Sequence, residues 1–304
     1  YGLTVAQIYS DLSAALTTET TSTTLTVGQD DYDVVIVDNL CNSKPVAVER
    51  IETLAGKKVV FYKEDVCDRE AMERIFSEQD IGAVIHFAGL KAVGESCRIP
   101  LRYYDNNVSG TRVLLEQMTA HDVGTIVFSS SAAVYGEPEQ IPIEETAALD
   151  PTNCYGETKR VMERMMCWTA AATGLRYAAL RYFNACGAHP DGSLGEAHFP
   201  ETHLIPLVLQ VANGQRSEIS VFGSDYPTPD GTCIRDYVHV CDLAQAHILA
   251  LEYLLRGGES TAFNLGSGQG FSVREVIEEA RRVTGHAIPA VEKARRSGDP
   301  ARLV

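Results

Sequence analysis

Tyr155 and Lys159 form the one Tyr-x-x-x-Lys spacing in the chain. On a helix, residues four positions apart share a face, so the ammonium can lower the pKa of the phenol and make a phenolate base near neutral pH. The same spacing also occurs as an ordinary exposed helix pair, and roughly 0.3 such spacings are expected by chance in this composition. By itself the pair is a weak signal for proton transfer.

A run of three serines ending at Ser131 supplies the second chemical group, about 24 residues before Tyr155 and directly after a predicted buried strand. A hydroxyl in this place can bond a substrate oxygen and relay its proton to the phenolate. A serine run after a strand would otherwise cap a helix or a turn. We therefore take Ser131, Tyr155 and Lys159 as the candidate catalytic residues.

Carboxylates and an aromatic residue mark the ends of three further predicted strands. Asp38 follows one apolar run, Asp65 follows the next, and Phe87, Ala88 and Gly89 end the third. A carboxylate after the second strand of a dinucleotide fold accepts both adenosine ribose hydroxyls and repels a 2′-phosphate, which favours NAD over NADP. An isolated Asp after a strand is more often a turn or cap residue, so Asp38 gains weight only from its neighbours at the ligand-binding edge.

The elements that position these residues are short apolar runs alternating with helical patterns from residue 34 onward. Runs that are hydrophobic on both faces and separated by helices are typical of a parallel sheet covered on both sides, which predicts an α/β, Rossmann-like doubly wound fold. The first-lobe strands are expected at 34–37, 59–61, 83–87, 125–128 and 177–182, and the helices at 69–77, 104–120 and 155–172. In the last helix Val161, Met165, Trp168 and Ala172 repeat at helical spacing, which predicts a core stripe.

After residue 184 the pattern changes to loops rich in Gly and Pro, which predicts a second, smaller α/β lobe. It would hold a helix at 201–212 and a strand at 219–222. The chain is then expected to return to the first lobe with a strand at 237–240 and a helix at 243–255, followed by a strand at 262–265 and a helix capped by Ser272. The predicted boundaries are 32–187 with 233–256 for the first lobe and 188–232 with 257–304 for the second.

The charge balance excludes some partners. The formal net charge is −15, so nucleic acid and anionic membranes would be repelled on average. No run approaches the length of a membrane helix, and the first basic residue is Lys44, so the basic start of a secretory signal is absent and a cytoplasmic location is expected.

The eight cysteines form no CxxC pair and are expected to be reduced packing residues. His198 and His203 are five apart, a spacing too weak to predict a metal site, so no metal is expected.

Longer blocks resemble a known family from about Tyr32 to the last residue. They read Asp-Asn-Leu-Cys-Asn-Ser at 38–43, His-Phe-Ala-Gly-Leu-Lys-Ala-Val-Gly-Glu-Ser at 86–96, Tyr-Tyr-Asp-Asn-Asn at 103–107, Arg-Tyr-Phe-Asn at 181–184 and Arg-Asp-Tyr-Val-His-Val at 235–240. In these blocks the chain resembles the extended short-chain dehydrogenases/reductases, and among them the UDP-glucose 4-epimerases.

The resemblance implies interconversion of UDP-glucose and UDP-galactose with tightly bound NAD. Tyr155 would take the 4-hydroxyl proton while hydride passes to the nicotinamide, Lys159 would hold the nicotinamide ribose, and Ser131 would bridge hydroxyl and phenolate. The implied cofactor contacts are Asp38, Asn39, Asp65, Val66, Phe87, Ala88, Gly89, Lys91, Asn106, Tyr155, Lys159, Tyr182 and Phe183. The implied UDP-sugar contacts are Lys91, Ser131, Tyr155, Asn184, Leu204, Phe222, Arg235, Arg296 and Asp299, whose two arginines offer forked donors to phosphate oxygens.

Residues 1–31 depart from the family pattern. Family members begin with a strand and a glycine-rich turn that approaches the pyrophosphate, yet the only glycines before Gly56 are Gly2 and Gly28. The run 21–27 is too close to 34–37 for a parallel crossover, although an antiparallel pairing is possible. We therefore expect no pyrophosphate cradle in this segment, and a fragment of the family fold with a foreign start and a shortened end.

Three functions remain open from the sequence. The first is an NAD-dependent epimerase of UDP-sugars, the second a non-catalytic remnant that binds a nucleotide sugar or a partner, and the third a related NAD-dependent nucleotide-sugar oxidoreductase. Ala132 and Ala133 stand where dehydrating and decarboxylating relatives carry acidic side chains, which disfavours those reactions. The resemblance also implies a homodimer through the helices at 104–120 and 155–172.

Overall fold

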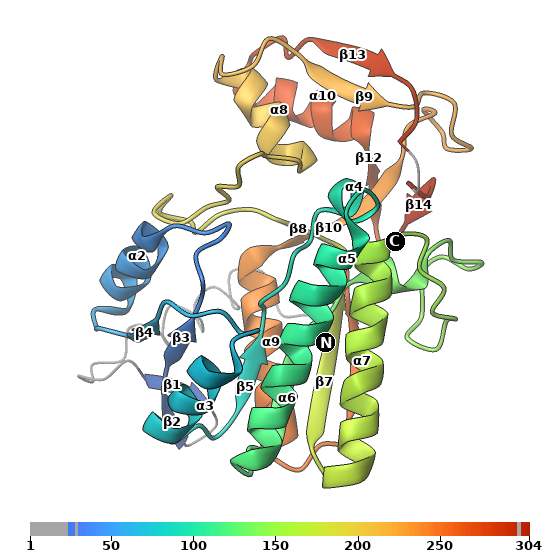
Figure 1. The fold of residues 1–304 in the computed structure, drawn as a ribbon. Helices are drawn as coiled ribbons and strands as arrows, with labels where there is room; N and C mark the ends of the chain where they lie inside the picture. Colours follow the sequence, from blue (N-terminus) through green and yellow to red (C-terminus); the bar gives the residue numbers. More distant parts are fainter. Residues whose placement is uncertain (1–23, 28–29, 297–298) are drawn as a thin grey trace.

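The computed structural model describes residues 24–27, 30–296 and 299–304. Most of the segment expected to lack a pyrophosphate cradle therefore lies outside the described residues. Within the described ranges the chain forms a larger lobe of parallel strands and helices, with a smaller lobe above it in Figure 1. This arrangement confirms the predicted α/β, Rossmann-like class.

The main sheet of the larger lobe has four parallel strands in the order β11-β7-β6-β5. They are β5 (Val84–His86), β6 (Thr125–Ser129), β7 (Arg176–Tyr182) and β11 (Thr261–Leu265). Alternate residues of β6 face opposite sides: Ile126 and Phe128 pack with α3 (Arg69–Glu78), α6 (Gly110–Ala120) and α7 (Cys154–Thr173), whereas Val127 packs with α9 (Val240–Leu255). The sheet is thus covered on both faces, as Figure 1 shows.

A second parallel pair, β3 (Val35–Val37) and β4 (Val60–Tyr62), forms its own two-stranded sheet beside α2 (Pro45–Ala55). Among the described strands, neither member pairs with the four-stranded sheet. The predicted doubly wound sheet is therefore present as two parallel sheets. Strands β1 (Thr24–Val27) and β2 (Asp30–Asp33) form an antiparallel hairpin. The antiparallel pairing that the sequence left possible was with 34–37, but β3 pairs with β4 instead.

The smaller lobe has its own core. Strands β9 (Ile219–Phe222) and β13 (Ala290–Lys293) pair in parallel, and helices α8 (Leu204–Ala212) and α10 (Val273–Thr284) pack against them. A mixed sheet joins this lobe to the larger one, because β10 (Ile234–His239) pairs with β8 (Asn184–Cys186), β12 (Gly270–Ser272) and β14 (Arg302–Leu303). The predicted boundary placed 262–265 in the smaller lobe, but β11 pairs with β7 and extends the main sheet instead.

The region predicted as one helix over 104–120 is built from two elements, a π-helix η1 (Tyr104–Ser109) and α6. The short helix α5 (Pro100–Tyr103) comes directly before them. Two shorter elements, α4 (Val93–Ser96) and the 3₁₀ helix η2 (Ala132–Tyr135), lie near the start of α7. π-Helical turns often occur at functional sites, and this one precedes the long straight part of α6.

Two packing predictions hold only in part. On α7 Met165 packs against the main core as predicted, but the fully buried apolar residues are Met162 and Met166, and Trp168 is 67% exposed. All eight cysteines are free, but only Cys233 is buried and Cys41, Cys97 and Cys167 are exposed. Among the described helices, none combines the length and the apolar character needed to cross a membrane.

Candidate active site

Tyr155 is the second residue of α7, and the start of this helix lies against the loop after β6. Asn153 caps the helix by accepting a hydrogen bond from Gly156 N at 2.9 Å, and Tyr155 N donates to Ser96 Oγ at 3.0 Å. Gly156 permits the close approach, because a Cβ there would lie 2.4 Å from the carbonyl oxygen of Ala133. Gly156 thus allows the phenol of Tyr155 to approach the three serines at 129–131, which we call the serine loop.

The phenol of Tyr155 lies close enough to Ser131 for this hydroxyl to lower the phenol's pKa. Ser131 lies at the carboxyl end of β6 and begins η2, where its Oγ also accepts from Ala133 N at 3.2 Å. Burial raises the pKa of Tyr155, the neighbouring phenol of Tyr182 raises it further, and the Ser131 hydrogen bond opposes these effects. Together these effects leave the pKa of Tyr155 above that of a free tyrosine.

Lys159 lies next to the phenol and is held by a strand end. Its ammonium is buried, donates to the Ser129 carbonyl at 2.7 Å and lies 4.8 Å from the centre of the Phe128 ring, while the Tyr155 ring centre is 5.9 Å away. Burial, partly opposed by Glu163, lowers the pKa of Lys159 to about 8. The direct hydrogen bond of the ammonium goes to the Ser129 carbonyl, and the effect of Lys159 on the phenol's pKa stays a prediction.

A buried ion pair below the serine loop was missed by the sequence reasoning. Arg181 Nη2 lies 2.6 Å from Glu163 Oε2, and both side chains are less than a tenth exposed. Arg181 also donates to Tyr135 Oη at 2.9 Å, and Tyr135 donates to Asn264 Oδ1 at 2.7 Å. Ser130 Oγ donates to the same carboxylate. Glu163 follows Tyr155 and Lys159 at the same four-residue spacing, and that spacing was the available signal.

Asn107 holds the loop after β5 and was also missed. Its Oδ1 accepts from Leu90 N at 2.7 Å, and its Nδ2 donates to Leu90 O at 2.9 Å and to Thr158 Oγ1 at 3.1 Å. The side chain of Asn106, a predicted cofactor contact, donates to Asn107 Oδ1 at 3.0 Å. The π-helix η1 therefore links the loop after β5 to α7, with Gly89 in contact range of both Asn107 and Lys159.

The predicted adenosine contacts come together at the carboxyl ends of β3 and β4. Asp38 Oδ1 accepts from Leu40 N at 2.7 Å and from Ser43 Oγ at 3.0 Å, and Asn39 Nδ2 donates to Asp65 Oδ2 at 2.8 Å. Burial raises the pKa of Asp65, but hydrogen bonds from Cys67 and Asn39 outweigh it and leave the pKa below its usual value.

The other predicted cofactor residues have different surroundings. Val66 packs against the main core, and Phe87 is 57% exposed at the end of β5 with its ring 4.6 Å from that of His247. Ala88 follows Phe87 in the same loop. The Tyr182 hydroxyl hydrogen-bonds to Ser129 Oγ, which places Tyr182 beside the serine loop, and Phe183 packs against η2.

The predicted UDP-sugar residues form two pairs in the smaller lobe. Arg235 Nη2 lies 3.4 Å from Asp299 Oδ1, and the Arg296 guanidinium lies 3.9 Å from the centre of the Phe222 ring. Asn184 opens β8 opposite Tyr237, and Leu204 opens α8. Lys91 Nζ lies 2.8 Å from His198 Nε2, so this lysine of the larger lobe meets the segment that leads to Leu204.

Comparisons with known proteins agree with this arrangement. Residues 22–266 match the model of the NAD dependent epimerase/dehydratase family. The chain is 55% identical over 271 residues to a UDP-glucose 4-epimerase of Halalkalibacterium halodurans, covering 89% of this chain and 79% of the relative. It is 54% identical over 275 residues to a UDP-glucose 4-epimerase of Streptococcus mutans, covering 90% and 80% of the two chains.

A solved structure gives the same result. The UDP-glucose 4-epimerase from Bifidobacterium longum in complex with NAD⁺ and UDP superposes with a TM-score of 0.85 at 47% identity, covering 89% of this chain and 82% of the other. The chain belongs to the NAD dependent epimerase/dehydratase family, and within it to the UDP-glucose 4-epimerases.

Proposed function

We propose that the chain interconverts UDP-glucose and UDP-galactose by transient oxidation at C4 with bound NAD. The observation that carries the proposal is the convergence of Tyr155 and Ser131 at the carboxyl edge of a parallel sheet, with the buried ammonium of Lys159 alongside. Open α/β sheets bind ligands at this edge. The 47% identical relative with NAD⁺ and UDP bound supports the same assignment.

The residues at this edge fit the two ends of NAD. Asp38 and Asn39 follow β3 and offer a carboxylate and an amide to ribose hydroxyls, and Lys159 offers a buried ammonium to the second ribose. Phe87 is exposed at the same edge, where a planar ring can stack on it. The further cofactor contacts would be Asp65, Val66, Ala88, Gly89, Lys91, Asn106, Tyr182 and Phe183. When bound, NAD would accept the hydride from C4 of the sugar and later return it.

The proton path uses the chain's own groups. The Ser131 hydroxyl would bond the sugar 4-hydroxyl and pass its proton to Tyr155. Burial raises the pKa of Tyr155, and nearby positive charge such as the Lys159 ammonium would favour the phenolate that acts as the base. A protonated Tyr155 then returns the proton when the carbonyl is reduced from its other face.

The smaller lobe would hold the uridine diphosphate. Arg235 and Arg296 offer forked donors to phosphate oxygens, and Phe222 presents the ring against which Arg296 packs. Asn184, Leu204 and Asp299 complete the proposed contacts, with Lys91 reaching the site from the larger lobe.

An assay of UDP-galactose turnover, coupled to oxidation of the UDP-glucose formed, tests the function. We expect Tyr155→Phe to lower kcat by about 10²–10⁴-fold with UDP binding retained, because it removes only the hydroxyl that moves the proton. Tyr253→Phe, at a half-exposed tyrosine of α9, is the matched control and should keep full activity. Equal turnover by wild type and Tyr155→Phe would exclude Tyr155 as the base.

A second candidate, a non-catalytic binder of nucleotide sugars, is favoured by one observation. Before Gly56 the printed sequence has only Gly2 and Gly28, so residues 1–55 contain no run of closely spaced glycines of the kind that usually contacts a pyrophosphate. The purified protein distinguishes the two candidates. Bound NAD with turnover supports the epimerase, whereas UDP binding by calorimetry without NAD or turnover supports the binder.

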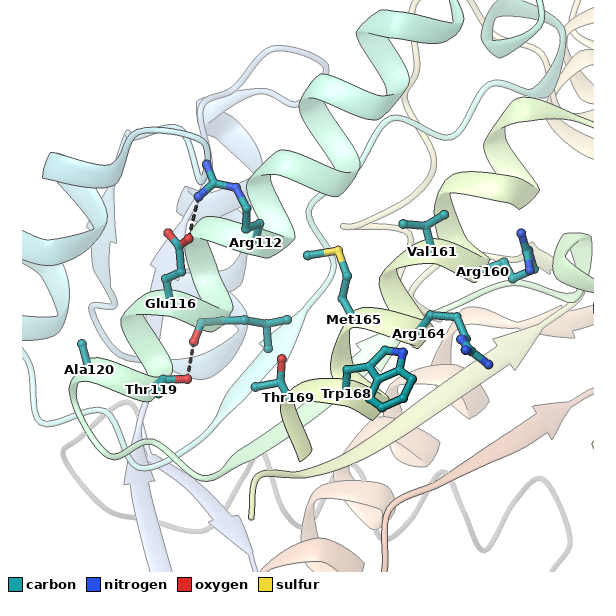
Figure 2. Close-up of a pocket in the computed structure, with 11 residues that line it drawn as sticks. Arg112, Glu116, Thr119, Ala120, Arg160, Val161, Arg164, Met165, Trp168 and Thr169 are labelled. Carbon is teal, nitrogen blue, oxygen red and sulfur yellow. Dashed lines mark hydrogen bonds and ion pairs between the residues drawn. The ribbon is translucent and has the colours of Figure 1, made fainter. Parts of the chain in front are cut away.

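We also propose that the protein is a homodimer through α6 and α7. A groove of about 920 Å³ lies between these helices, and Met165 and Trp168 of α7 line it. In Figure 2 Met165 extends toward α6, whereas the Trp168 ring lies beside Arg164. Leu115 and Val161 also line it. Trp168 is 67% exposed, and the ion pairs Arg112–Glu116 and Arg160–Glu157 flank the groove. A second copy of this face would cover the apolar residues. Twofold symmetry would place the ion pairs of one copy next to those of the other.

A further inference from the structure

Four side chains of the segment between β8 and α8 bring their ligand atoms together. Glu196, His198, Glu201 and His203 each offer one nitrogen or carboxylate oxygen, and these atoms lie within 4.8 Å of one another. His198 Nδ1 lies 3.0 Å from Glu196 Oε1 and 3.5 Å from Glu201 Oε2. His203 Nδ1 contacts the same oxygen of Glu196. The four groups therefore surround one point.

The two carboxylates of this cluster are largely shielded from water. The side chains of Glu201 and Glu196 are 6% and 18% exposed, whereas those of His198 and His203 are 28% and 38% exposed. Neighbouring carboxylates in such a setting repel each other unless positive charge lies between or beside them. The two imidazoles face these carboxylates, and Lys91, whose Nζ meets His198 Nε2, brings one positive charge from outside the cluster. A divalent cation at the centre would bind the imidazole nitrogens and offset the charge of both carboxylates.

The ligand types select among cations. Mg²⁺ and Ca²⁺ prefer oxygen ligands alone, whereas Zn²⁺ binds imidazole nitrogen and carboxylate oxygen and takes four protein ligands in structural sites. We propose that Glu196, His198, Glu201 and His203 bind one Zn²⁺ ion. The sequence expectation of no metal considered only the two histidines, since the contribution of the glutamates depends on how the chain turns at Pro200.

A four-ligand ion at this place would have a structural role. The segment that carries the ligands leads into Leu204 and α8 in the smaller lobe, and two contacts tie it to the larger lobe. These are Lys91 Nζ to His198 Nε2 at 2.8 Å and Arg50 Nη1 to the Ser193 carbonyl at 2.8 Å. Zn²⁺ would fix the segment in the shape that makes both contacts and so hold the two lobes in register. The metal test below does not depend on the proposed epimerase activity, although Lys91 and Leu204 next to the cluster are also proposed UDP-sugar contacts.

Metal binding to the full chain provides the test. Protein stripped with EDTA is titrated with Zn²⁺, and the metal retained after gel filtration is counted per chain. We expect one Zn²⁺ per chain and an X-ray absorption spectrum with nitrogen and oxygen ligands at about 2.0–2.2 Å and no sulfur. The absence of sulfur matters because the chain also has eight free cysteines. Mg²⁺ in excess should not displace the ion.

Matched variants decide whether the cluster is the site. His203→Gln and Glu201→Gln should each weaken Zn²⁺ binding by about a hundredfold or more, since each removes a ligand. His189→Ala, in the same segment but paired with Asp191 outside the cluster, should bind as wild type does. Unfolding of the metal-free variants checks that they fold. Substoichiometric Zn²⁺, sulfur ligands, or wild-type binding by His203→Gln would each overturn the proposal.

Discussion

The ion pair of Glu163 and Arg181 stabilises the residues around the serine loop. The ion pair is buried, and its members also hold Ser130 and Tyr135 next to the serine loop. Removing one partner of a buried pair leaves the other charge uncompensated, so we expect Glu163→Gln to lower the free energy of unfolding by about 3 kcal/mol or more. Urea denaturation gives the measurement. Glu157→Gln breaks the more exposed pair with Arg160 and should cost less than about 1 kcal/mol, and equal losses would contradict the argument.

Lys159 predicts a pH dependence of stability. Its pKa is about 8 in the folded protein and 10.5 in the reference state, so between these values the unfolded chain binds more protons and the free energy of unfolding rises with pH. The shift corresponds to roughly 3 kcal/mol. Other groups titrate in the same range, so the measured quantity is the difference between wild type and Lys159→Met. We expect this difference to increase in favour of wild type from pH 8 to 10.5. A constant difference would show that burial does not lower the pKa of Lys159.

Residue types and spacing could identify Ser131, Tyr155 and Lys159, because these groups need only sit on adjacent elements to meet. They could not give the direction of the Lys159 ammonium, since the Ser129 carbonyl competes with the phenol for it. Nor did they reveal the cluster around Glu196, which forms only when an irregular segment folds back on itself. Side-chain direction in loops depends on tertiary contacts that a sequence pattern does not contain.

At the scale of elements, the start of α7 sets the position of Tyr155. The Asn153 side chain accepts from Gly156 N at 2.9 Å and satisfies a donor that the first helical turn leaves free. We expect Asn153→Ala to lower the free energy of unfolding by about 1 kcal/mol and Asn153→Asp to restore most of it, because a carboxylate caps equally well. Chemical denaturation of the three proteins measures this. If the alanine and aspartate variants lose the same amount, the cap is not the cause.

The sequence located the long elements well. Strands β6, β7, β9 and β11 and helices α3, α7 and α9 lie within a few residues of their predicted bounds, because their apolar periodicity is strong. It missed β8, β12 and β14, which have two or three residues and exist only because β10 offers them backbone partners. It also missed η1, where the side chain of Asn107 bonds the Leu90 backbone. Elements created by a single tertiary contact carry no periodic signal.

At the scale of the whole molecule, the site is assembled from two lobes that are folded around separate cores. The proposed proton-transfer groups belong to the larger lobe, whereas Arg235, Arg296 and Phe222 belong to the smaller one and its linking sheet. Strand β10 connects them, since it carries Arg235 and pairs with β8 directly after the end of β7. The relative position of the lobes therefore decides whether a nucleotide sugar can reach both sets of residues, and contacts such as Lys91 with His198 gain importance for this reason.

The proposed dimer is also a property of the whole molecule. An interface with twofold symmetry places each Trp168 in the same contact area, so one substitution acts twice in every dimer. Burying a charge among apolar groups at a central tryptophan costs at least about 2 kcal/mol, so Trp168→Glu should weaken the dimer by thirtyfold or more. Sedimentation velocity over a concentration series measures this. Leu249→Glu, at a 53% exposed residue of α9, should leave the dimer intact, and a wild type that stays monomeric at micromolar concentration would exclude the interface.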